Sequence, residues 1–517
     1  MISMMAMNAG EASAQGKASK THTETFPVVA AQKGDKAFTL EDLNFGGNNY
    51  RNMVAKNRWC TWWGDELVRQ DIDACYLVNK ATGKETKLFS IDQINQWIAP
   101  TKDIKVRALY NAQFPFAGKS IVMVSNGSKL FTIDFKKHKL ISEMEYAEGE
   151  SLLEANAQQN AFAYLKGSNL YVRTFDVANY NAMTKDKKSH DFQISTDGSR
   201  EIVYGQSVHR DEFGISKGTF WSPNGEKLAF YRMDQSMVTD YPQVDIPEIG
   251  FDHPETQSCI ATPAPDKYPM AGETSHKVTV GVFDCLTGKT IYLKAGDPTD
   301  RYFTNIAWSP DGKTIYMFEV NRDQNDCRLT AYSAETGEKT GELYRETDEK
   351  YVEPCHPILF LPWDSSSFIM QSRKDGYNHL YLCTLGKHGS RMASNTESLE
   401  IKQLTSGKWE VMDVLGFNAK TKSIIIASNE CSPIQRNIFS VDTKTGKRKM
   451  IDDCGKGWHN ATLSQNGEYI YDNYSTPTLP RKIAIVNTAN GKRTAYFTAE
   501  NPWKGYNVPE YSCGSIK

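Results

Sequence analysis

The chain has 517 residues, which is enough for several ordinary domains or for one large repeat architecture. Its 60 basic and 62 acidic residues leave a net charge of −2 without any basic run, so neither nucleic acid nor an anionic membrane is an expected partner. An aromatic content of 11% favours an all-β fold, and no apolar run has the length of a membrane-spanning helix.

The first residues resemble the end of a secretory signal. Met1–Met7 is mostly apolar, and Ala12-Ser13-Ala14 has the small-x-small form of a signal-peptidase site. Because a cationic start is missing, we expect the true start of the signal to lie upstream. Residues 1–36 are therefore expected to be a signal remnant with a disordered N-terminus, and the protein to be secreted or periplasmic. A disordered cytosolic N-terminus is the alternative.

The sequence predicts neither a metal site nor a cofactor. Ten cysteines are scattered along the chain: Cys60, Cys75, Cys259, Cys285, Cys327, Cys355, Cys383, Cys431, Cys454 and Cys513. Their even number suits an oxidising compartment, but no close pair has metal-ligand spacing, and their pairing stays open. Gly-Lys-Thr and Gly-Lys-Ser at residues 288, 312 and 118 lack the earlier glycine of a phosphate-binding loop.

Two recurring turns predict a β-propeller over residues 37–500. A Gly-Lys or Gly-Glu hairpin recurs at about fifty residues or multiples of it, a propeller-blade length, and degenerate copies near His138, Asp176 and Gly386 bring the hairpins to eight. A Ser-Pro-x-Gly turn, or a weaker form of it, follows Trp221, Trp308 and Leu463. Short strands follow these turns or stand alone, at Leu228–Tyr231, Ile315–Phe318, Tyr469–Tyr471, Ile121–Val124, Phe368–Met370 and Ile424–Ala427.

One proline-rich insertion interrupts the repeats between Pro242 and Ser275. Loops of that length in compact folds are usually functional or make contacts. Shortly before it, Gly214-Ile215-Ser216-Lys217-Gly218 matches the Gly-x-Ser-x-Gly pattern of serine hydrolases. That pattern needs a helix after the serine, and a strand is expected here, so Ser216 is not assigned as a nucleophile.

Four ionisable residues in a row, His209, Arg210, Asp211 and Glu212, form the candidate binding site. Two adjacent carboxylates repel each other, so they are stable only if exposed or if a cation binds between them. A substrate ammonium group is such a cation, and Arg210 could hold one carboxylate through a bidentate pair. A solvated loop without a ligand is the alternative.

Several collinear stretches resemble dipeptidyl peptidase IV of the prolyl oligopeptidase superfamily, especially its secreted bacterial relatives. They are Leu40–Gly47, Trp221–Gly225, Tyr268–Gly272, Asp375–Leu380 and Leu404–Val411. The resemblance implies an eight-bladed β-propeller of the kind that, in this family, sits over an α/β-hydrolase domain.

The resemblance also implies a role for the charged loop. In the family, a propeller loop carries a glutamate pair that binds the free N-terminal amine of the substrate. Anchored on Trp221, that pair falls on Arg210 and Asp211, and a shift of one residue brings Glu212 into place. Glu212 is therefore the expected amine ligand, with Asp211 assisting and Arg210 beside them. Because the pair is not intact, removal of dipeptides or of tripeptides stays open.

At its C-terminus the chain stops at Lys517, where the family would enter its hydrolase domain. We expect residues 501–517 to begin the connection to an absent hydrolase domain. The resemblance then implies the propeller part of a secreted serine exopeptidase that removes Xaa-Pro di- or tripeptides, binding the substrate amine and gating access. Without the catalytic serine, histidine and aspartate of the hydrolase domain, the chain alone should not cleave peptides, so no catalytic residue is assigned.

The partners expected on the same grounds are peptides with a free N-terminus, with a homodimer as a further expectation. A stand-alone propeller that acts as a binding or scaffold protein is the alternative. An in-frame hydrolase segment beyond codon 517 would decide between the two readings.

Overall fold

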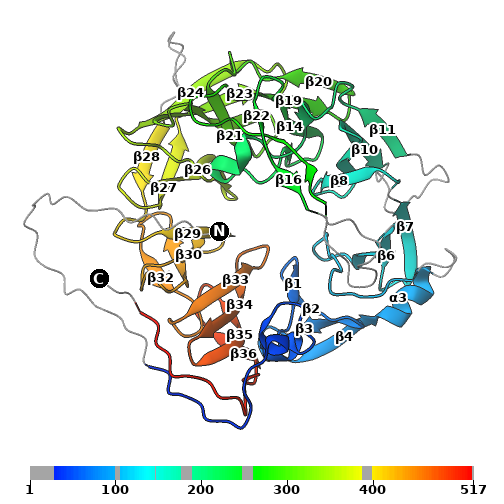
Figure 1. Ribbon diagram of the computed structural model, residues 1–517, viewed down its shortest axis with the longest axis vertical. Coiled ribbons are helices and arrows are strands. Elements are labelled where there is room, and N and C mark those ends of the chain that lie inside the picture. The colour runs from blue at the N-terminus through cyan, green and yellow to red at the C-terminus, as the bar shows by residue number, and fades with distance from the viewer. Residues whose placement is uncertain are drawn as a thin grey trace, which may run out of the picture.

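Eight β-sheets follow one another around a ring in the computed structural model of this chain (Figure 1). The structure describes residues 28–98, 105–127, 129–145, 147–175, 189–246, 260–386 and 399–514. Within each of these sheets the paired strands are antiparallel, and strands that are consecutive in sequence lie side by side, except in the fourth sheet, which has two insertions. Each sheet is one propeller blade, so the predicted all-β, eight-bladed fold is confirmed.

The first four blades contain strands β1 to β14, β19 and β20. Blade 1 has β1 (Cys60–Trp63), β2 (Glu66–Gln70), β3 (Ala74–Val78) and β4 (Glu85–Ser90); blade 2 has β5 (Ile121–Ser125), β6 (Lys129–Asp134) and β7 (Lys139–Glu145). Blade 3 has β8 (Glu150–Ala155), β9 (Ala161–Lys166), β10 (Asn169–Phe175) and β11 (Ser189–Gln193). Blade 4 has β12 (Ile202–Tyr204), β13 (Thr219–Trp221), β14 (Lys227–Asp234), β19 (Lys277–Asp284) and β20 (Lys289–Tyr292).

The last four blades contain four strands each. Blade 5 has β21 (Arg301–Trp308), β22 (Thr314–Asn321), β23 (Asp326–Ser333) and β24 (Lys339–Thr347); blade 6 has β25 (Leu359–Leu361), β26 (Asp364–Ser372), β27 (His379–Leu385) and β28 (Leu399–Gln403). Blade 7 has β29 (Val411–Asn418), β30 (Ser423–Ser428), β31 (Asn437–Asp442) and β32 (Arg448–Met450); blade 8 has β33 (Trp458–Leu463), β34 (Tyr469–Thr476), β35 (Leu479–Asn487) and β36 (Arg493–Thr498).

The predicted Trp-Ser-Pro turns join each inner strand to the next one. In blade 4, the Gly225 N–H donates to the Ser222 carbonyl over 2.8 Å, and Gly225 has the positive φ of 73° that a glycine adopts without strain. The tryptophans before these turns fasten each blade to its neighbour. Trp221 Nε1 donates to the Glu154 carbonyl of blade 3 over 3.3 Å, and Trp308 Nε1 donates to the Phe220 carbonyl of blade 4 over 3.0 Å.

Blades 8 and 1 meet and close the ring. Their core strands pack through a cluster of buried side chains, Leu67, Val78, Tyr471, Ile483 and Ile485. Several hydrogen bonds also join the blades beside this cluster; for example, the Gln465 N–H donates to the Gly64 carbonyl over 3.1 Å, and Trp62 Nε1 donates to Thr462 Oγ1 over 3.1 Å. Among the described residues every sheet is built from strands of one continuous part of the chain, so no shared β-ladder closes the circle at this point.

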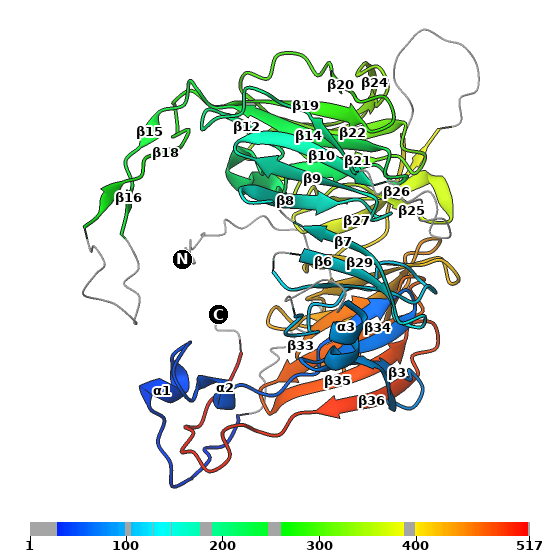
Figure 2. The ribbon, with the colours of Figure 1, turned by 90° about the vertical axis from the view of Figure 1, so that its right-hand side faces the viewer.

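The insertion in blade 4 forms an arm on one side of the ring (Figure 2). It contains the short ladders β15 (Asp240–Tyr241) with β18 (Asp266–Lys267), and β16 (Val244–Asp245) with β17 (Thr262–Pro263). The short helices α1 (Leu40–Leu43) and α2 (Tyr50–Met53) project on the same side, whereas α3 (Ile91–Ile98) packs beside blade 2 (Figures 1 and 2). The arm exposes apolar side chains, including Val244, Ile246 and Ile260.

The segment before blade 1 runs beside the segment after blade 8. Val29, Gln32 and Lys36 form backbone bridges with Tyr511, Val508 and Tyr506, respectively. Residues 1–27 of the expected signal remnant and disordered N-terminus fall outside the described residues, as do the hairpin predicted near Asp176 and most of the one predicted near Gly386. In the described ranges no helix is both long and apolar enough to cross a membrane.

Candidate functional site

The charged loop predicted from the sequence is an insertion in the inner strand of blade 4. Strands β12 and β13 both pair with β14, β12 with Arg232–Asp234 and β13 with Leu228–Phe230. Residues 205–218 leave the sheet between them and carry the short helical turn η1 (His209–Gly214). The loop therefore begins and ends on the same strand, which fixes both of its ends.

Most of η1 has an unusual backbone. His209, Arg210, Asp211 and Phe213 have φ between 55° and 64°, in the left-handed region, and none of them is glycine. Each such residue costs about 1–2 kcal/mol relative to an ordinary conformation, so surrounding contacts must hold the turn.

Blade 5 and the segment before blade 6 supply those contacts. Buried His209 accepts a hydrogen bond at Nε2 from the Phe303 N–H over 3.2 Å, and Asn305 Nδ2 donates to the Phe213 carbonyl over 3.1 Å. At Gly214, where φ is 71°, a Cβ would lie 2.3 Å from the Cys355 carbonyl oxygen. Only glycine fits this approach, so the turn is tightly seated between two blades.

The three predicted site residues lie together on the exposed side of the turn but have different partners. Arg210 forms the expected pair with a carboxylate, although the carboxylate is that of Asp266 in the arm, 2.6 Å away, rather than that of Asp211 or Glu212. Asp211 accepts a hydrogen bond from Ser207 Oγ. Glu212 Oε2 accepts a hydrogen bond from Gln324 Nε2 over 3.0 Å. The amine-binding roles of these residues stay predictions.

Glu212 lies beside a set of polar side chains that come mainly from blade 5. Gln324 stands in the β22–β23 turn, and its Nε2 also lies 3.3 Å from the phenol oxygen of Tyr302 on β21. Arg322, in the same turn, donates from Nη1 to that phenol over 3.0 Å and to Ser275 Oγ over 2.8 Å. No sequence pattern marked these residues, because they follow the charged loop by about 60 to 110 positions in ordinary hairpin and strand contexts.

Two buried histidines lie beside these polar side chains. The rings of His209 and His276 stack with centroids 5.3 Å apart, and three of their four ring nitrogens have no partner among the described residues. Burial lowers the pKa of His276 to about 4, helped by the charges of Arg322 and Arg210. Burial and the same Arg322 charge hold the pKa of His209 well below its usual value. Both rings are therefore neutral at physiological pH.

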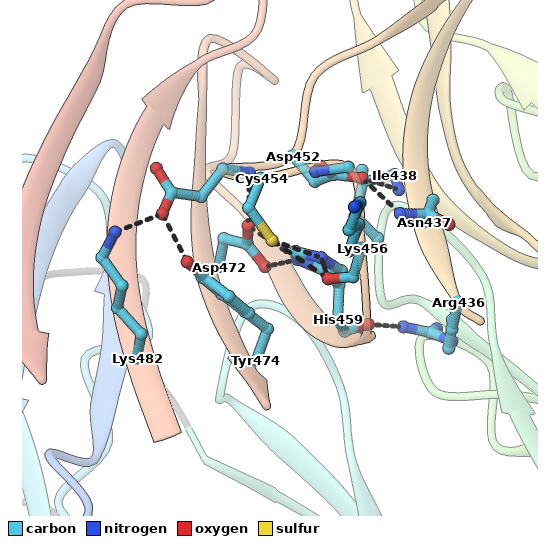
Figure 3. A network of polar contacts seen from close by, with 12 residues as sticks. Arg436, Asn437, Ile438, Asp452, Cys454, Lys456, His459, Asp472, Tyr474 and Lys482 are labelled. Carbon is cyan, nitrogen blue, oxygen red and sulfur yellow. Dashed lines mark hydrogen bonds and ion pairs between the residues drawn. The ribbon is translucent and has the colours of Figure 1, made fainter. Parts of the chain in front are cut away.

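A second polar cluster, centred on His459, lies in blade 8 (Figure 3). His459 Nδ1 is 2.8 Å from Asp472 Oδ1, and Nε2 is 3.0 Å from the Lys456 carbonyl oxygen. Burial alone would lower the pKa of His459, but the hydrogen bond and charge of Asp472 raise it to about 10. Burial raises the pKa of Asp472 as well, but the hydrogen bond and charge of His459 oppose that rise, so we treat the pair as an imidazolium and a carboxylate, both fully buried.

The other carboxylates of this cluster also have partners. Asp452 Oδ2 accepts from Asn437 Nδ2 over 3.0 Å, and Asp453 Oδ2 accepts from Lys482 Nζ over 2.8 Å and from the Tyr474 phenol over 2.6 Å (Figure 3). Each acid is matched by a side chain of blade 7 or blade 8, so the cluster fixes the entry to β33 and is a structural feature rather than a binding site.

Ser216 lies on the exposed end of the charged loop, and β13 follows it instead of a helix. Throughout the described ranges no hydrogen bond joins a serine to a histidine, and no group of three metal-ligating side chains is present. The chemistry that these residues can supply is the binding of charged and polar groups.

Known proteins share this architecture. The family model of the dipeptidyl peptidase IV N-terminal region matches residues 116–481. A crystal structure from Bacteroides ovatus, provisionally assigned as a dipeptidyl aminopeptidase IV, is 42% identical with a TM-score of 0.77, over 91% of this chain and 64% of its own. Dipeptidyl peptidase 4 of Porphyromonas gingivalis, at 20% identity, shares the fold with a TM-score of 0.68 over 92% of this chain and 64% of its own.

Curated relatives agree with these structures. A Pyrenophora tritici-repentis protein, provisionally named dipeptidyl-aminopeptidase B, is 24% identical over 497 residues, which are 90% of this chain and 52% of that protein. The chain therefore spans about half the length of such a relative. Because the family model covers most of the propeller, the chain belongs to the family of the dipeptidyl peptidase IV N-terminal region.

Proposed function

We propose that this chain is the propeller part of a serine exopeptidase and that Glu212 binds the free N-terminal ammonium of peptide substrates. The observation that carries the proposal is the state of the Glu212 carboxylate. It is exposed, it accepts one hydrogen bond from a neutral amide, and no cationic side chain of the described residues lies within ion-pair distance. A carboxylate without a counter-ion, on a backbone held rigidly between two blades, can take an ammonium group.

The relatives support the peptide class, because the name dipeptidyl aminopeptidase describes removal of dipeptides from amino ends. Preference for Xaa-Pro sequences, release of di- or tripeptides, secretion and gating of access belong to the same proposal. Cleavage would need a nucleophile, a base and an oxyanion site, none of which the described residues bring together, so the function proposed for this chain is substrate binding.

Peptide binding to the chain itself tests this function. The probes are an Ala-Pro-initiated peptide with a C-terminal fluorophore and its N-acetylated form, compared by fluorescence anisotropy. We expect the free amine to bind at least about tenfold more tightly, since a hydrogen bond to a charged group contributes about 1.5–3 kcal/mol. Glu212→Gln should remove this preference.

Glu338→Gln is the matched control, because Glu338 is an exposed glutamate that pairs with Lys294 in a different turn. It should leave the preference intact. Equal affinity of the unmodified chain for the two peptides would contradict the proposed function.

A further inference from the structure

Exposed lysines from blades 6, 7 and 8 gather on one side of the ring. They come from the outer strands β28 and β32 and from the turns that follow β29, β31 and β35. We call this set the lysine patch, and its members are Lys402, Lys420, Lys422, Lys444, Lys447, Lys449 and Lys492. No basic run marks the patch in the sequence, because its lysines are spread from residue 402 to residue 492 and meet only in the fold.

Hydrogen bonds between the turns hold these lysines side by side. Lys402 Nζ of blade 6 donates to the Lys444 carbonyl of blade 7, and Lys449 Nζ donates to the Ala489 carbonyl of blade 8 over 3.2 Å. The Lys422 carbonyl accepts two hydrogen bonds from the residue before Lys444, over 2.8 and 3.2 Å. The patch is therefore one continuous surface that crosses two blade boundaries.

Few carboxylates neutralise the patch. Glu468 lies 3.4 Å from Lys420 Nζ, and Asp442 accepts hydrogen bonds from the hydroxyl and the N–H of Thr445 in its own turn. Among the residues that the structure describes, no carboxylate lies within ion-pair distance of the remaining lysines of the turns. These four unpaired lysines are Lys422, Lys444, Lys447 and Lys492.

Elsewhere on the same side of the ring, several lysines pair with acids. In blade 1, Lys80 Nζ lies 3.0 Å from Glu66 Oε2, and in blade 4 Lys227 pairs with Asp284. The whole chain has a net charge of −2. The positive charge of the patch is therefore a local excess rather than a property of the whole surface.

The arm projects from the opposite side of the ring (Figure 2). The turns of the patch join the first strand of a blade to the second or the third to the fourth, whereas the arm joins the second strand of blade 4 to the third. In an antiparallel sheet these two kinds of connection lie at opposite ends of the strands. A ligand on the patch would therefore leave the charged loop, which contacts the arm, accessible.

The patch has no apolar component. From residue 399 to residue 500 the only exposed large apolar side chain is Trp458, which begins β33 and so lies at the far end of its strand from the lysine turns. Surfaces that bind membranes add apolar side chains that enter the lipid, and surfaces that bind single-stranded nucleic acid add aromatic rings on which bases stack. Neither feature accompanies these lysines, so the ligand that fits is polar as well as anionic.

We propose that the lysine patch binds an acidic carbohydrate polymer, one that carries carboxylate or sulfate groups along its length. Each ammonium group is a compact, hydrated charge on a flexible stem, which suits exchangeable contacts with such groups. Several weak contacts along one polymer reinforce one another, because the later contacts form within the complex. The inference does not depend on the proposed function, since it uses none of the residues of the charged loop.

Fluorescence anisotropy of labelled polysaccharides with the chain of 517 residues tests the proposal. The probes are heparin, which has sulfate and carboxylate groups, polygalacturonate, which has carboxylates only, and neutral dextran. We expect heparin, or both acidic polymers, to bind and dextran not to bind. Affinity should fall steeply as sodium chloride is raised, since salt screens contacts between exposed charges. Binding of heparin alone identifies sulfate as the required group, and binding of both polymers shows that carboxylate suffices.

The variant that removes the patch combines Lys422→Gln, Lys444→Gln, Lys447→Gln and Lys492→Gln. It should bind the acidic polymers at least about tenfold more weakly, because it loses four exposed ion pairs together.

The matched control combines Lys84→Gln, Lys166→Gln, Lys289→Gln and Lys313→Gln, which replace exposed lysines of four other blades. Its net charge changes by the same amount, and its affinity should stay within about twofold, because dispersed charges act only through a screened long-range field. Thermal unfolding establishes that both variants are folded.

The absence of binding to either acidic polymer would overturn the proposal. An equal loss of affinity in the two variants would also overturn it, because binding would then depend on total charge rather than on the patch. Vesicles of phosphatidylcholine and phosphatidylglycerol should not bind. Binding of these vesicles without binding of the polymers would assign the patch to a membrane surface instead.

Discussion

The blade 4–5 junction and blade 8 each bury histidine beside charged groups, but the buried rings have opposite protonation states in the two clusters. In blade 8, Asp472 faces His459 and raises its pKa to about 10, so the ring is charged and paired. At the junction, His276 is buried and faces arginines, so its pKa falls to about 4 and the ring is neutral. The residue type and the burial are alike, and the neighbouring charge decides the outcome.

The difference also separates structure from function. Every carboxylate of the blade 8 cluster has a partner in blade 7 or blade 8, so its acidic groups are already satisfied. At the junction, Glu212 and Arg322 have opposite charges and neutral partners only. Charges that a fold leaves unmatched at a rigid surface are available to a ligand, whereas matched ones stabilise the fold.

The largest expected effect on stability comes from removing the carboxylate that pairs with His459 in blade 8. Asp472→Ala leaves the buried imidazole without its carboxylate and should lower the free energy of unfolding by about 3–5 kcal/mol. In the unmodified chain, the stabilisation is fully present below the unfolded pKa of about 6.5 and is lost as pH rises through about 10.

Urea unfolding at pH 6.5, 8 and 9.5 measures this dependence, and Asp472→Ala should lack the alkaline loss. A variant with unchanged stability, or a wild-type profile that is flat over this range, would show that the two clusters do not differ in the way described.

The backbone of the charged loop at the blade 4–5 junction is held by close packing instead of matched charge. A substitution at Gly214 tests this packing. Gly214→Ala should destabilise the chain by about 2–3 kcal/mol, because a positive φ and a clash with the Cys355 carbonyl act together. Gly118→Ala is the matched control, since Gly118 has the same φ of 71° but nothing within 4 Å of an added Cβ, and it should cost only about 1 kcal/mol.

Thermal unfolding compares the two glycine variants, and peptide binding should fall only in Gly214→Ala. Equal destabilisation in both variants would mean that the contact with Cys355 contributes nothing to holding the turn.

The smallest expected effect is on the stability of the chain at acidic pH. The folded pKa of His276 is about 4 and its unfolded pKa about 6.5, so the unfolded chain binds a proton first and stability falls as pH drops through this window. His276→Gln should remove a loss of about 2 kcal/mol between pH 7 and pH 4.5. Hydrogen exchange of β19, which begins at the next residue, measures the effect locally.

His138→Gln serves as the control, because His138 is an exposed histidine in the turn after β6. It should leave the acid dependence of β19 unchanged. An identical acid loss in the wild type and in His276→Gln would assign that loss to other groups.

The sequence was sufficient for the blades and for the position of the charged loop. The Trp221 turn and the strand after it are where the turn chemistry predicted them. The strand β14 extends beyond the predicted Leu228–Tyr231 to Asp234, because backbone pairing with β12 and β19 continues through polar residues that hydropathy does not mark. The charged loop likewise lies where four ionisable residues in a row suggested.

The rest of the site could not be predicted, because it depends on which turns of neighbouring blades meet. Tyr302, Arg322 and Gln324 look unremarkable in their own segments and acquire a role only beside Glu212. The backbone of the loop was also hidden, since left-handed conformations at His209, Arg210 and Asp211 occur without glycine and are imposed by blade 5. The partner of Arg210 was unforeseen for the same reason, because Asp266 comes from the arm.

The closure between blades 8 and 1 has a mechanical consequence. Since no described strand crosses from one end of the chain into the other end's sheet, the circle is fastened there by side-chain packing and individual hydrogen bonds rather than by a shared β-ladder. This seam can widen without breaking any sheet, whereas opening any other gap also stretches a covalent connection. The segments around residues 29–36 and 506–511, which flank the same seam, are joined by backbone bridges and so limit how far it can open.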